Sequence, residues 1–64
     1  MDKNVIREYL MESTGSRAQI VKYLGEPAIS IQVDTLARSI AQLANESGQT
    51  EENIWERKKD IFLA

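Results

Sequence analysis

Residues 27–34 read PAISIQVD, and the conformation of this stretch decides the architecture of the chain. Pro27 blocks helix continuation, because its ring fixes φ and removes a backbone donor. In the six residues after it, β-branched apolar side chains alternate with small or polar ones, which is the period-two pattern of a half-buried strand. The sequence therefore predicts a β-strand from Ala28 to Val33, with Asp34 as the N-cap of a following helix.

Two helices are predicted before this strand from their apolar periodicity. The first runs from Asn4 to about Ser13. The second lies between Ser16, which caps it, and Gly25, which ends it. Its predicted apolar stripe consists of Ile20, Val21 and Leu24.

Two more helices are predicted after the strand. One extends from the Asp34 cap to Gly48, and the last is capped by Thr50, with Glu51 and Glu52 favourably placed in its first turn. The predicted fold class is thus mainly α with one short β-strand.

A lone strand cannot satisfy its own backbone donors and acceptors, and no other segment has the pattern of a strand. We therefore expect it to pair antiparallel with its own copy about a two-fold axis, in a homodimer. Residues 27–64 would form the dimerisation and binding unit and residues 1–26 an N-terminal helical extension, in one compact domain. The expected dimer core consists of Ile29, Ile31, Val33, Leu36, Ile40, Leu43, Ile54, Trp55 and Ile61.

The segment AISIQVDTLARSIAQLANESGQTEENIWERKKDIF, which begins at Ala28, resembles the ribbon-helix-helix family of DNA-binding regulators. The resemblance rests on the alternating strand, an acidic cap, a helix, a glycine turn, and a Thr50 cap followed four residues later by Ile54. It implies an intertwined homodimer whose two-stranded ribbon enters the major groove of double-stranded DNA. It also implies that the backbone at the start of the second helix holds phosphate. By this resemblance the protein is a sequence-specific transcriptional regulator, a small repressor or an antitoxin. The residues assigned to DNA binding are Ala28, Ser30, Gln32 and Thr50.

Composition excludes several classes of protein. The 64 residues include no cysteine and no histidine, which removes thiol nucleophiles, thiolate zinc sites and the commonest general base. We expect no enzymatic activity, no metal and no cofactor. No stretch approaches the roughly 18 apolar residues of a membrane span, so we expect no membrane association and a cytoplasmic location.

Two other interpretations remain open at this stage. The net charge of −2 and the acidic Glu51-Glu52 pair also suit a helical protein-binding module that inhibits or sequesters a partner protein. The segment from Arg17 to Val33 can alternatively be read as a helix-turn-helix, with Gly25 in the turn.

Overall fold

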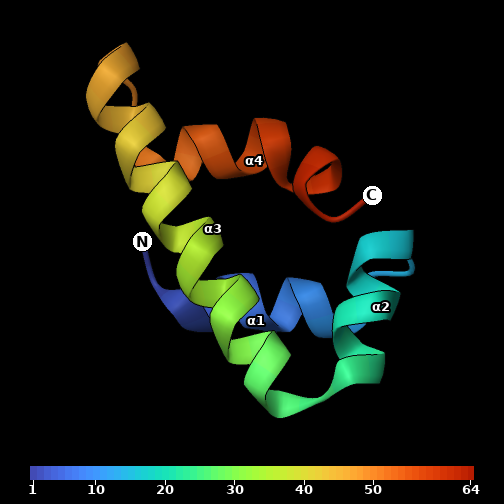
Figure 1. The fold of residues 1–64 in the computed structure, drawn as a ribbon. Helices are drawn as coiled ribbons and strands as arrows, with labels where there is room; N and C mark the ends of the chain where they lie inside the picture. The colour runs from blue at the N-terminus through green and yellow to red at the C-terminus, as the bar shows by residue number, and fades with distance from the viewer.

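The structure is a computed structural model that describes residues 1–64 as four α-helices (Figure 1). These are α1 (Lys3–Glu12), α2 (Ser16–Leu24), α3 (Glu26–Ser47) and α4 (Glu51–Phe62). The longest helix, α3, packs against each of the other three. It crosses the view of Figure 1 diagonally, with α4 beside its C-terminal half and α2 diverging from its N-terminal end.

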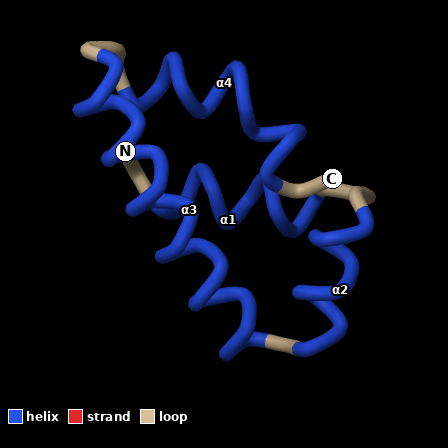
Figure 2. The backbone as a smooth tube through the Cα atoms, turned by 45° about the horizontal axis from the view of Figure 1, so that its top comes forward, coloured by secondary structure: helices blue, strands red, loops and turns tan.

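The predicted β-strand is wrong, because Ala28 to Val33 lie within α3 and the chain has no strand (Figure 2). Pro27 stands in the first turn of α3, where its missing N–H costs no intrahelical bond. Asp34 lies inside the helix instead of capping it. The fold class is therefore all-α, and the strand pairing predicted across an intertwined homodimer has no strand to form it.

A longer helical repeat overrides the short alternation. The buried residues of α3 follow one another at intervals of three or four, which is the spacing of a single helical face. Ile31 fits the strand pattern but not this helical repeat. Its exposed fraction is 66%, as expected for a residue outside the buried face of the helix. A short apolar run fits either structure, so the length of the repeat decides. The buried residues of α3 are Ile29, Val33, Leu36, Ile40 and Ala44.

The helices predicted at residues 4–13 and 16–24 and after Thr50 are confirmed, and Gly48 ends α3 as predicted. Gly25 ends α2 with a φ of 97°, a conformation that glycine adopts without strain. The Thr50 hydroxyl accepts the Asn53 N–H at 3.1 Å, as expected of an N-cap. Ser16 is the first residue of α2 and not its cap, since Gly15 occupies the N-cap position.

The core is one cluster of twelve buried residues, all of them apolar and drawn from all four helices and the C-terminal tail. Between α1 and α4, the ring of Tyr9 meets that of Trp55 edge to face, with 5.4 Å between centroids. A single copy of the chain thus encloses its own apolar core. None of the four helices combines the length and the apolar character that crossing a membrane requires.

α2 is anchored by small side chains, because the two residues buried in it are Ala18 and Val21. The two buried residues of α1 and the two of α4 are larger. The C-terminal tail adds a backbone contact, in which the N–H of Arg17 donates to the carbonyl oxygen of Ala64 at 3.1 Å. A Cβ on Gly15 would lie 2.0 Å from the carbonyl oxygen of Leu63, so this close approach requires glycine.

Substitutions of Ile29 and Ile31 distinguish a helix from a strand, because the two side chains share a face only in a strand. Ile29 is 4% exposed, and Ile29→Ala should lower the free energy of unfolding by about 2–4 kcal/mol because it leaves a cavity. Ile31→Ala should change it by less than about 0.5 kcal/mol, because this side chain is exposed. Urea denaturation measures both, and equal losses for the two variants would contradict the helix.

Gly15→Ala should destabilise the fold by about 1–3 kcal/mol, because the added methyl group forces the main chain of the tail away from α2. The control is Ser16→Ala at the neighbouring exposed position, which should leave the urea midpoint nearly unchanged. Equal midpoints for Gly15→Ala and the unmodified protein would show that the tail does not pack on Gly15.

Candidate functional site

The structure does not bring the predicted DNA-binding residues together. Ala28 and Gln32 are four residues apart, so they lie on one face of α3, and both are half-buried. Ser30 is exposed on a different side of the helix. Thr50 lies beyond the far end of α3, and the helix between Ser30 and Gly48 is about 27 Å long. Without the strand, these four residues have no common face to offer to DNA.

Most residues predicted for the dimer core are buried inside one protomer. This holds for Ile29, Val33, Leu36, Ile40, Ile54 and Trp55. Leu43 is half-buried and packs on the same cluster. Ile31 and Ile61 are exposed to 66% and 69%.

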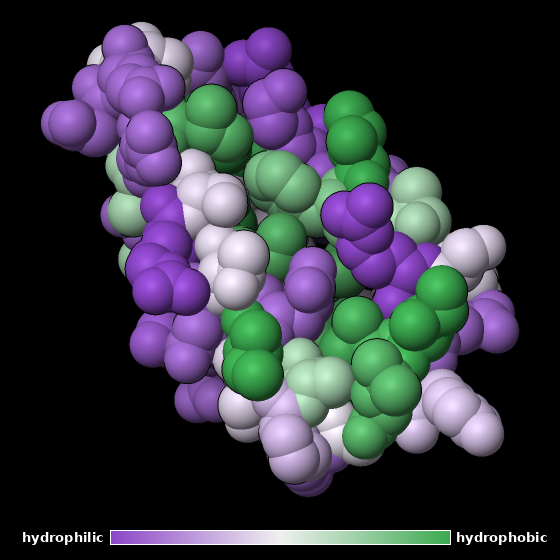
Figure 3. Space-filling view, in the orientation of Figure 1, coloured by the Kyte–Doolittle hydropathy of each residue, from purple (hydrophilic) through white to green (hydrophobic).

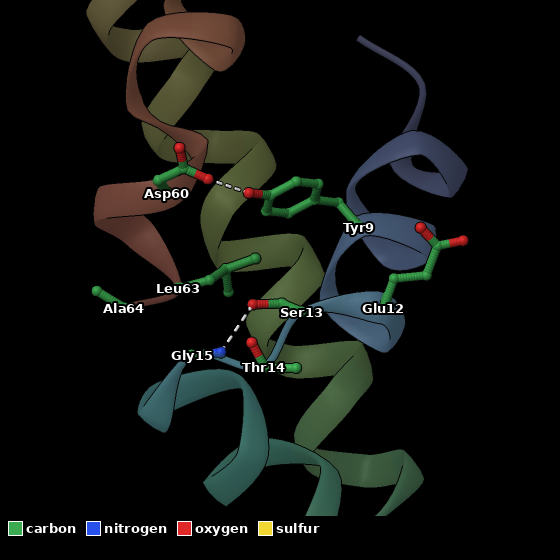
Figure 4. A pocket seen from close by; sticks show the side chains of 8 residues that line it. All are labelled: Tyr9, Glu12, Ser13, Thr14, Gly15, Asp60, Leu63 and Ala64. Carbon is green, nitrogen blue, oxygen red and sulfur yellow. Dashed lines mark hydrogen bonds between the residues drawn. The ribbon is translucent and has the colours of Figure 1, made fainter.

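A hollow of about 400 Å³ lies between the end of α1 and the C-terminal tail (Figure 4). The Tyr9 hydroxyl donates to a carboxylate oxygen of Asp60, and the Gly15 N–H donates to Ser13 Oγ at 3.1 Å. These polar groups therefore bind one another. The hollow is lined by Tyr9, Glu12, Ser13, Thr14, Gly15, Asp60, Leu63 and Ala64.

The electrostatics of this hollow favour a protonated tyrosine. The hydrogen bond to Asp60 raises the pKa of Tyr9 above its usual value of 10.0, and desolvation and the nearby carboxylates act in the same direction. The ammonium of Lys59 lies 5.1 Å from the centroid of the Tyr9 ring. A phenol held neutral in this way is a poor general base at neutral pH. The chain also has no cluster of three or more side chains arranged to hold a metal ion.

A second hollow of about 360 Å³ lies between α3 and α4. Gln42 donates to Glu46 at its edge, at 3.0 Å. Glu46 is the only ionisable side chain that lines it, so it offers less chemistry than the first hollow. Its lining residues are Ser39, Gln42, Leu43, Glu46 and Phe62.

Large apolar side chains gather on the outer surface of α2 and the N-terminal part of α3, where Figure 3 shows green side chains over both helices. We call this set, which consists of Ile20, Tyr23, Leu24 and Ile31, the apolar face. Their exposed fractions are 61%, 90%, 64% and 66%. Large exposed apolar side chains that gather on one surface of a monomer often mark a functional site.

Two free arginines flank the apolar face. Arg17 precedes Ile20 by three residues and Arg38 follows Ile31 by seven, so each lies on the same side of its helix as its apolar neighbour. Both are exposed, and neither guanidinium takes part in a hydrogen bond or an ion pair.

The acidic groups near this face are already paired. α2 contains no acidic residue. In the N-terminal half of α3, Glu26 accepts from the guanidinium of Arg7, and Asp34 pairs with Lys3 at 3.0 Å. α2 and the N-terminal half of α3 therefore carry unpaired positive charge beside the apolar face but no unpaired carboxylate, although the whole chain carries −2.

The sequence prediction missed this surface, because it placed Ile20 and Leu24 in a packing stripe. α2 instead buries Ala18 and Val21 and turns its larger apolar residues outwards. The signal was the spread of apolar residues around SRAQIVKYL, which is too wide for one buried stripe of a short helix.

No protein-family model, no curated protein and no solved structure matches this chain. The comparisons therefore add no support to the resemblance to ribbon-helix-helix regulators.

Asp60→Ala should lower the pKa of Tyr9 towards 10.0, because the hydrogen bond to Asp60 is the largest cause of its raised value. Because the pKa of Tyr9 is raised in the folded state, its contribution to stability is fully present below pH 10. That contribution is lost as the pH rises through the pKa that Tyr9 has in the folded protein. The alkaline decline should therefore be shallower in Asp60→Ala. NMR titration of the Tyr9 ring and unfolding above pH 10 measure the two effects.

The control for this titration is Glu56→Ala, which removes the smallest of the contributing charges and should shift the pKa of Tyr9 less. An unchanged pKa in Asp60→Ala would show that Tyr9 does not bond to Asp60 in solution.

Proposed function

We propose that this protein is a protein-binding module that docks a partner on its apolar face. The observation that carries this proposal is the exposure of four large apolar side chains on two adjacent helices, while one chain already encloses its own core. Exposed apolar surface of this kind marks sites of protein association more often than isolated surface residues do. Placing the protein in the cytoplasm is part of the same proposal.

Binding is favoured over catalysis by the contents of the two hollows. In the larger hollow Tyr9 is bonded to Asp60 and held protonated, and Ser13 is bonded to the Gly15 N–H. An active site instead needs an unsatisfied acid, base or nucleophile that can reach a substrate.

DNA binding is less well supported by the same surface. Base contacts were assigned through a ribbon, and the fold has no strand. Lys3 and Arg7, which could contact phosphate, are paired with Asp34 and Glu26. Affinity for DNA depends on clustered free cations, and the apolar face has only its two flanking arginines.

The proposal predicts that a polar substitution on the apolar face removes partner binding without harming the fold. Leu24→Ser and Ile20→Ser change exposed side chains, so the free energy of unfolding in urea should change by less than about 0.5 kcal/mol. Affinity capture from an extract of the native source should recover a partner protein in stoichiometric amount with the unmodified chain. Either variant should recover at least tenfold less of that partner.

Ile61→Ser is the matched control, because Ile61 is 69% exposed and lies on α4 outside the apolar face. It should retain the captured protein. If Leu24→Ser and Ile20→Ser capture as much as Ile61→Ser does, the apolar face is not the binding surface.

A further inference from the structure

We infer that the occupant of the apolar face is an acidic amphipathic helix of another protein. Its apolar side chains would cover Ile20, Leu24 and Ile31, and its carboxylates would reach Arg17 and Arg38. This inference rests on the proposed function and specifies the chemistry of the partner.

The charges beside the apolar face favour an acidic partner. Arg17 and Arg38 are exposed and unpaired, and the carboxylates of the neighbouring segment are held by Lys3 and Arg7. A partner with carboxylates beside its apolar stripe would meet these two unpaired guanidinium groups. A guanidinium also pairs with a carboxylate through two parallel hydrogen bonds, which fixes the orientation of the bound segment.

The same charges argue against a second copy of the chain. In a two-fold dimer each apolar face would meet the same face of the other copy, so two surfaces with unpaired arginines would be brought together. Neither helix of the face supplies a free carboxylate to separate them, because α2 has none and those of Glu26 and Asp34 are engaged. Like charges across an interface disfavour association.

The arrangement of the helices favours a helical occupant. α2 and α3 diverge from Gly25 (Figure 1), and both expose apolar side chains on the surface seen in Figure 3. Ile20 and Leu24 are spaced like neighbours on one helical ridge, into whose grooves the side chains of a third helix can pack. A bound helix that presents apolar residues at intervals of three and four can contact the exposed apolar side chains of α2 and of α3 at the same time.

The test uses two labelled helical peptides of roughly 18 residues, long enough to hold helical structure in isolation. Both carry the same leucine stripe, flanked by glutamates in one and by lysines in the other. The full chain should bind the glutamate peptide at least tenfold more tightly, measured by fluorescence anisotropy. Added salt should weaken this binding, because the contacts at the rim are exposed charge pairs.

Two charge-removing variants locate the contacts. Arg17→Gln and Arg38→Gln should each weaken binding of the glutamate peptide by about threefold, as expected for an exposed ion pair. Arg57→Gln is the control, because Arg57 is exposed on α4 and bonds to Gln49 outside the apolar face. The control should bind like the unmodified chain, and circular dichroism should show that all three variants keep their helix content.

Four outcomes overturn the inference: equal affinity for the two peptides, no binding of either, an undiminished affinity in both arginine variants, or a dimer mass in sedimentation that Leu24→Ser abolishes. The last outcome would assign the face to a second copy. The proposed function is judged separately by capture with the serine variants. A partner captured through Leu24 together with equal peptide affinities would therefore refute only the acidic helix.

Discussion

The buried stripe of α3 is the constraint on which the rest of the structure depends. Its residues recur at helical spacing over the whole element, and α1, α2 and α4 each pack against this one helix. A helix that contacts every other element must stay continuous, because a break would divide the core. Extended backbone between Pro27 and Asp34 would remove Ile29 and Val33 from that core together.

Much of this fold could be predicted from local signals. The ends of the helices followed from glycines and caps, because Gly25, Gly48 and Thr50 act through the backbone of their own turn. The six residues after Pro27 could not be assigned in this way, since period two and period 3.6 share several positions in so short a run. Ile31 was the discriminating residue, and only its exposure in the packed chain shows which repeat holds.

The candidate site was harder to predict than the fold. Periodicity shows that α2 has an apolar side but not which side faces the core, and the small Ala18 takes the buried position beside Val21. The flanking charge was also hidden, since the net charge of −2 suggests an acidic surface. Local positive charge arises because acidic residues of α3 pair with Lys3 and Arg7, which are far from them in the sequence.

The sparse anchoring of α2 has a consequence for how binding and dynamics are linked. A helix held by two small buried side chains should open locally at a smaller free energy than α3, which buries five, so its amides should exchange hydrogen with solvent sooner. A ligand that binds only the closed form suppresses this opening in proportion to its concentration and affinity. The helix that carries most of the apolar face would then be the part of the molecule whose order depends most on whether that face is occupied.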